Sequence, residues 1–171
     1  MDGRELLRSQ YGFAQDNLEA AIERCSPELL RKTIEGSLTN PIGATYAHTV
    51  MTQDLVLVRG LMGQEPVYHS SGIGERVGFE LPESPVISQD YTTSLSFELE
   101  PLREYAAAMR ATVDGYLESA SDEDLAAEVP FGPTPRSKLW VFGTLGVWHV
   151  ASHQGEIAAL MGLEGEKGQM L

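Results

Sequence analysis

The chain has 171 residues, of which 42% are hydrophobic and 22% charged, and its formal net charge is −13. This length and composition are typical of one globular domain, residues 1–171, and not of a disordered chain. The 12 basic residues are outnumbered by 25 acidic ones, which argues against nucleic acid or an anionic membrane as a partner, and no apolar run of about 18 residues predicts a membrane span.

Two long helices are predicted in the first part of the chain. Residues 4–24 carry apolar side chains at helical spacing among charged ones. Ser26-Pro27 is typical of the start of a short helix, because a serine side chain caps the first turn and proline fits its first position. The pair Asn40-Pro41 gives the same signal for a second long helix over residues 41–62, which a glycine ends.

A long connection over residues 63–95 is expected to be irregular, because glycines and prolines recur along it. A connection of this length in a compact domain is usually mobile or functional, so we expect it to cap a site. Gly72-Ile73-Gly74 within it is not read as a phosphate-binding loop, because no lysine followed by serine or threonine comes after it.

Two further long helices are predicted in the second half. The third covers residues 98–119, with Pro101 in its first turn, where proline is tolerated. A short helix begins after Ser121, and a turn or short hairpin follows over Val129–Pro135. Ser137 then caps the fourth long helix, which ends near residue 162.

The fourth predicted helix contains three glycines, Gly143, Gly146 and Gly155. Each costs roughly 0.5–1 kcal/mol relative to alanine inside a helix. A close approach of a neighbouring helix is the expected reason, and Gly155 would bring that helix near His153. Alternatively, the first two glycines lie in an irregular segment and the helix begins after them.

The most informative motif is His149-Val-Ala-Ser-His153-Gln-Gly-Glu156 in this fourth helix. Histidines four residues apart project from one helix face, so their imidazoles can share one divalent metal ion. His48, inside the second predicted helix, is the candidate third ligand. Three histidines leave a coordination position open, which is the arrangement of catalytic metal sites.

These histidines, the long second connection and the segment Gly155–Gly165 resemble the DinB-like superfamily. The resemblance implies an all-α, up-down-down-up four-helix bundle that forms a homodimer. It also implies a divalent ion, zinc or nickel, bound by His48, His149 and His153. Better understood members of the superfamily join a low-molecular-weight thiol to an electrophile, or isomerise maleylpyruvate with mycothiol.

Glu156 is the candidate catalytic residue, because it follows His153 by three residues and therefore lies near the same helix face. It can orient a ligand histidine or act as a general base, and the alternative is a solvated carboxylate. Asp54 follows His48 by six residues, on a different side of that helix, and is not a candidate.

Four other residues are expected to have no part in catalysis. His69 lies in a polar segment and is expected to be solvated. Cys25, the only cysteine, is expected to be a small buried or peripheral residue, so a transferred sulfur would come from a cosubstrate. Trp140 and Trp148 are expected to pack in the bundle or at a dimer interface.

Two classes of function remain open. The first is a metal-dependent enzyme that acts on a small-molecule substrate, either a thiol S-transferase or a hydrolase, because a Lewis-acidic ion can activate a thiol or a water. The alternative is a metal- or small-ligand-binding bundle without catalysis. The N-terminal residues do not resemble a signal peptide and no disulfide framework exists, so a cytoplasmic location is expected.

Overall fold

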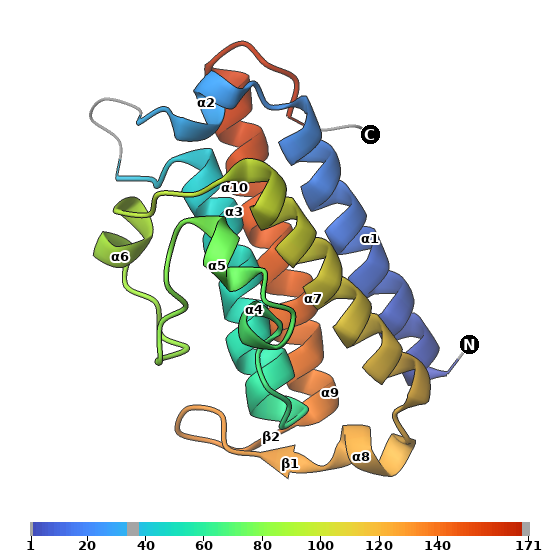
Figure 1. Ribbon diagram of the computed structural model, residues 1–171. Coiled ribbons are helices and arrows are strands. Elements are labelled where there is room, and N and C mark those ends of the chain that lie inside the picture. Colours follow the sequence, from blue (N-terminus) through green and yellow to red (C-terminus); the bar gives the residue numbers. More distant parts are fainter. Residues whose placement is uncertain (1, 34–37, 169–171) are drawn as a thin grey trace.

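Four long helices lie side by side, as the sequence predicted, and form a helical bundle (Figure 1). The computed structural model describes residues 2–33 and 38–168. The long helices are α1 (Gly3–Arg24), α3 with its π-helical continuation η1 (Ile42–Gln53 and Asp54–Leu61), α7 (Leu99–Ser119), and α9, η2 and α10 in one run (Lys138–Val141, Phe142–Trp148 and His149–Leu163).

The first and last of these helices run in one direction and the middle two in the other (Figure 1). At one end of the bundle the Arg4 guanidinium donates to the carbonyl oxygen of Ala120, just after α7, at 3.1 Å. At the other end the Arg24 guanidinium donates to the carbonyl oxygen of Gly168, just after α10, at 3.2 Å. The predicted up-down-down-up order is therefore confirmed.

Short polar side chains fix the starts of several helices. The Asp2 carboxylate accepts from the backbone N–H of Glu5 at 2.8 Å, and the Glu5 side chain accepts from the backbone of Asp2 in return. Ser26, Ser121 and Ser137 cap the helices predicted to follow them. The first two of these helices are α2 (Pro27–Arg31) and α8 (Asp122–Ala126).

The interior of the bundle is built from apolar faces of all four helices, and Asp54 is the one acidic or basic side chain that is buried there among the residues described. Asp54, at the start of η1, has an exposed fraction of 0%. Its carboxylate accepts from the backbone N–H groups of Val67 and Tyr68 at 2.8 and 3.0 Å and from the Tyr105 hydroxyl at 2.6 Å. Asp54 thus ties the beginning of the long connection to α7.

The long connection is more regular than the sequence predicted, because it contains three short helices. They are α4 (Val67–Ser70), α5 (Gly74–Val77) and α6 (Gln89–Thr93). The first two pack against α7, whereas α6 packs against α3. The expectation of an irregular segment therefore holds only for the stretches between these helices.

The glycines of the last helix differ in their surroundings. A Cβ atom added to Gly146, in η2, would lie 3.1 Å from Cδ2 of Tyr11, whereas Gly143 and Gly155 have nothing within 4 Å. The expected close approach therefore occurs at Gly146. The expectation that Gly155 brings a neighbouring helix close to His153 is wrong, because that glycine faces open space.

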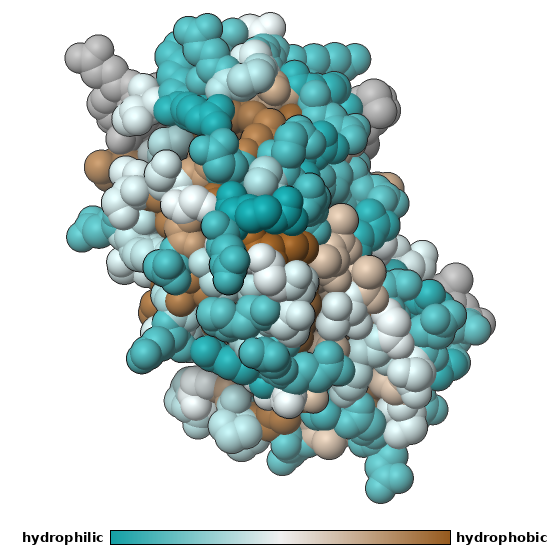
Figure 2. All heavy atoms as spheres, viewed as in Figure 1, coloured by the Kyte–Doolittle hydropathy of each residue, from teal (hydrophilic) through white to brown (hydrophobic). Residues whose placement is uncertain are grey.

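The remaining secondary structure is a small hairpin at the end of the bundle near α8. Its strands β1 (Glu128–Val129) and β2 (Arg136–Ser137) pair antiparallel, as the turn signals predicted. The face of the molecule shown in Figure 2 is mostly hydrophilic, with apolar residues in patches between polar ones. Among the described residues, the helices are too short or too polar to cross a membrane.

Candidate metal centre

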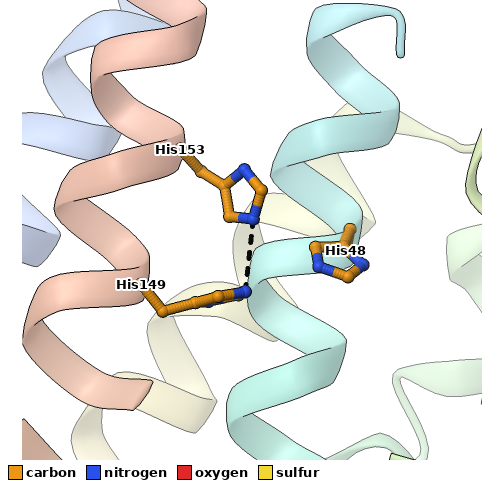
Figure 3. A group of neighbouring side chains, drawn as sticks. All are labelled: His48, His149 and His153. Atoms are coloured by element: carbon orange, nitrogen blue, oxygen red, sulfur yellow. Dashed lines mark hydrogen bonds between the residues drawn. The ribbon is translucent and has the colours of Figure 1, made fainter. Parts of the chain in front are cut away.

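The structure brings the three predicted histidines together. His149 and His153 project from one face of α10 towards α3, which carries His48 (Figure 3). The Nε2 atoms of His149 and His153 lie 3.2 Å apart. The ring centroid of His48 lies 5.4 Å from that of His149 and 5.1 Å from that of His153. One ligand nitrogen from each ring lies within 4.8 Å of the others.

This geometry suits a shared divalent ion. Two nitrogens that bind one zinc ion tetrahedrally, at about 2.1 Å each, lie about 3.4 Å apart. The observed separation of 3.2 Å between the two Nε2 atoms is close to that value. The cluster could therefore hold a metal ion, although imidazole ligands suit zinc, nickel, copper and iron alike and leave its identity open.

The protonation state of the histidines also suits a metal ion. Burial, assisted by the neighbouring His153, lowers the pKa of His48 to about 4 and that of His149 to about 3. Both rings are therefore neutral near pH 7, the state in which imidazole binds metals. Their Nδ1 atoms are buried without a hydrogen-bond partner among residues 2–33 and 38–168.

Glu156 lies beside the third histidine. Its Oε2 atom is 3.0 Å from Nδ1 of His153, one helical turn earlier on α10. A carboxylate only accepts hydrogen bonds, so this contact places the ring proton on Nδ1 and leaves the lone pair of Nε2 directed at the cluster. Glu156 is thus in place to orient His153.

A cavity of about 310 Å³ opens beside the cluster, lined by His48, His153 and Glu156 among others. One of its walls comes from residues 38–40 and another from the end of the long connection, including Gln89 and Thr92 of α6. The Gln89 side chain donates to the carbonyl oxygen of Leu38 and so joins the two walls. The part of the connection that borders the site is therefore its last third, because α4 and α5 pack elsewhere.

The other residues considered from the sequence lie away from this cavity. His69 is exposed on α4 beside Tyr68. Cys25 is buried at the end of α1, and burial raises the pKa of its thiol to about 11. Trp140 stacks with Arg136, but Trp148 is 66% exposed and is not packed inside the bundle.

Sequence reasoning missed several residues that line the cavity. Thr45 precedes His48 by three residues, so helical spacing alone places it on the same face of α3, and that signal could have identified it. Asn40 and Gln89 belong to segments without a regular period, and their place beside the histidines follows only from the fold.

Comparisons with known proteins agree with this architecture. The DinB superfamily model matches residues 10–157, which include all three histidines and Glu156. This chain is similar to a crystal structure described as that of a conserved protein from Enterococcus faecalis. The similarity covers 97% of this chain and 99% of the other, with a TM-score of 0.80 and 18% sequence identity. At that identity the likeness concerns the fold alone. The comparison with curated proteins gave no match. Because the family model spans most of the chain, the protein belongs to the DinB superfamily.

Proposed function

We propose that this protein is a metal-dependent enzyme that acts on a small molecule, either as a thiol S-transferase or as a hydrolase. The observation that carries the proposal is the convergence of His48, His149 and His153 beside a cavity of about 310 Å³. It supports catalysis because three nitrogen ligands leave a coordination position open to a substrate in the cavity. The net charge of −13 and the small cavity favour a small molecule over nucleic acid.

A zinc or nickel ion held by His48, His149 and His153 would supply Lewis acidity, which lowers the pKa of a thiol or water bound to it. The chain itself supplies the orientation of the ligands, because Glu156 holds the Nδ1 proton of His153. Glu156 also lines the cavity and can accept a proton from a nucleophile there. Cys25 does not line it, so a reacting thiol would belong to a cosubstrate.

The proposal includes a homodimer and a cytoplasmic location. The homodimer is what the family resemblance implies, and Phe13 on α1, 71% exposed, and Trp148 on η2, 66% exposed, are the large apolar side chains through which we propose the contact. Light scattering on the purified protein tests the dimer: a mass twice that of the 18.7 kDa chain is expected, and the mass of one chain would contradict it.

The metal site is tested by elemental analysis of protein purified without a histidine tag and then equilibrated with zinc or nickel. We expect about one ion per wild-type chain and little in the His149→Ala/His153→Ala double variant. His69→Ala is the matched control, because it removes an exposed histidine outside the cluster. Equal metal content in the wild type and the double variant would contradict the proposal.

Catalysis is tested with the metal-loaded protein. It is screened with cellular thiols plus electrophiles, and separately with ester and amide substrates. We expect turnover in one of these screens that His48→Ala abolishes and His69→Ala preserves. Tight metal binding without turnover in either screen would instead support a bundle that binds a metal or small ligand without catalysis.

A further inference from the structure

The cavity beside the histidines changes in character from its inner end to its mouth. His48 and His153, which are half-buried, line the inner end together with the buried Thr45 and Thr92. Leu38 lines the same cavity and is 90% exposed, more than any other large apolar side chain among residues 2–33 and 38–168. The mouth of the cavity therefore presents an aliphatic surface to water.

Ile87 gives the cavity a second aliphatic side chain. It belongs to the wall that the end of the long connection forms, whereas Leu38 belongs to the wall formed by residues 38–40. Ile87 is half-buried and packs against the hydrophobic core, which holds it in position. Two aliphatic side chains from different segments of the chain thus border one opening.

Several polar groups at this mouth already have partners within the protein. The Gln89 side chain donates to the carbonyl oxygen of Leu38, and the Thr93 hydroxyl donates to the side-chain oxygen of Asn40 at 2.7 Å. These bonds fix the backbone that carries the exposed leucine. An aliphatic side chain is stabilised by leaving water, so a ligand that covers Leu38 and Ile87 gains affinity from its own apolar surface.

We propose that the substrate of this protein carries an uncharged apolar segment, which packs against Leu38 and Ile87 while its reacting group lies at the histidine cluster. The inference rests on the proposed metal-dependent function and adds the class of substrate, a small molecule with a reactive head and an apolar tail. Because the tail is uncharged, its binding does not depend on the net charge that a metal ion and Glu156 produce together.

The tail is tested with Co(II)-loaded protein, whose visible absorption changes when a thiol binds. The probes are the straight-chain thiols from ethanethiol to 1-pentanethiol. They have nearly the same acidity and differ in the length of the aliphatic chain, so the cobalt–sulfur bond and the nearby charges contribute equally throughout. We expect the affinity to rise about two- to fourfold with each added methylene. An affinity that does not rise with chain length overturns the proposal.

Leu38→Ser and its matched control, Val86→Ser, show where the tail lies. Val86 is 84% exposed and directly precedes Ile87, but it does not line the cavity. We expect Leu38→Ser to weaken 1-pentanethiol about three- to tenfold and to leave ethanethiol unchanged, whereas Val86→Ser changes neither affinity. Both side chains are exposed, so neither substitution removes packing from the core. Equal losses of 1-pentanethiol binding in the two variants, or no loss in Leu38→Ser, overturn the proposal.

A second measurement does not need the metal. 1-Pentanol has the same aliphatic chain without the sulfur, and it is added to metal-free protein with isotope-labelled leucine and isoleucine methyl groups. We expect the methyl NMR signals of Leu38 and Ile87 to shift more than that of Leu6, which is exposed on α1 and does not line the cavity. Single substitutions at these positions assign the signals. Larger shifts at Leu6 than at the two cavity residues contradict the proposal.

The outcomes separate this inference from the proposed function. In protein that holds cobalt through its histidines, a chain-length gain that Leu38→Ser retains in full overturns the inference and leaves the proposed function standing. The same is true if no thiol changes the cobalt spectrum. Equal cobalt content in the wild type and in His149→Ala/His153→Ala overturns the proposed function and this inference with it.

Discussion

Nδ1 of His153 lies 3.0 Å from Oε2 of Glu156, one helical turn further along α10. The contact determines which ring nitrogen of His153 faces His149, because the carboxylate can accept a hydrogen bond but cannot donate one. His149 has no such partner for its Nδ1 atom among the described residues. The two histidines of the motif are therefore held differently: His153 contacts a carboxylate through Nδ1, whereas His149 contacts Nε2 of His153 through its own Nε2 atom.

From this contact we predict that Glu156→Ala weakens zinc binding about 10- to 100-fold, the usual effect of removing a group that orients a ligand histidine. Glu156→Gln should lose less, because its side-chain oxygen still accepts from Nδ1. Competition with a chromophoric chelator measures both affinities, and Glu128→Ala on β1 serves as the control. Zinc binding in Glu156→Ala that equals wild type would show that burial alone positions His153.

The histidine cluster could be predicted from the sequence because the information for it is either local or carried by the family resemblance. His149 and His153 are joined by a helical spacing that any α-helix converts into a shared face. Their meeting with His48 depends on how α3 and α10 pack, and spacing alone does not determine that. The resemblance supplied the order of the helices. In the structure the ring centroid of His48 lies 5.4 Å from that of His149 and 5.1 Å from that of His153, so the three rings do meet.

Other features could not be read from local patterns. The π-helical segments η1 and η2 have compositions compatible with an ordinary α-helix, so their changed hydrogen bonding was not expected. Asp54 is not a candidate site residue from its spacing, and the sequence gives no sign of its partners Val67, Tyr68 and Tyr105, which are 13 to 51 positions away. Hydrogen bonds between residues so far apart in the sequence follow from the tertiary fold and not from a local pattern.

We predict that Asp54→Ala destabilises the protein by about 3–5 kcal/mol without removing a metal ligand. The substitution leaves two buried backbone N–H groups and the Tyr105 hydroxyl without their acceptor. Urea unfolding measures the loss. Asp90→Ala is the control, because Asp90 is exposed on α6. A loss below about 1 kcal/mol would mean that these groups find other partners.

The stability of the protein should depend on the ionisation of Glu19. Burial raises the pKa of this carboxyl above its usual value, although the Tyr46 hydroxyl donates to it at 2.5 Å. A raised pKa in the folded state means that the protonated form stabilises folding at low pH. That contribution is lost as pH rises through the folded-state pKa.

We therefore predict that Glu19→Gln, which keeps an acceptor for Tyr46 and has no proton to lose, gains stability relative to wild type as pH increases from 4 to 7. Urea unfolding at several pH values in this range gives the difference in free energy of unfolding. Glu128→Gln should show no trend, because Glu128 is exposed. A difference between Glu19→Gln and wild type that stays constant or shrinks as pH rises contradicts the assignment.

Gly146 and Gly155 lie in the same long helix but have different surroundings, so the effect of adding a methyl group can be compared between them. Gly155→Ala should raise the free energy of unfolding by about 0.5–1 kcal/mol, because alanine favours the helix and nothing lies within 4 Å of the new Cβ atom. Gly146→Ala should instead lower the free energy of unfolding by about 1 kcal/mol, because the new Cβ atom would lie 3.1 Å from the buried ring of Tyr11.

Urea unfolding of the two variants gives the sign of each effect, and their zinc affinity provides the control. Gly155 is two residues from His153 but faces open space, so Gly155→Ala should bind zinc as wild type does. A gain in stability from both substitutions would mean that Tyr11 moves aside at little cost. In that case the close contact between α1 and η2 does not explain why a glycine occupies position 146.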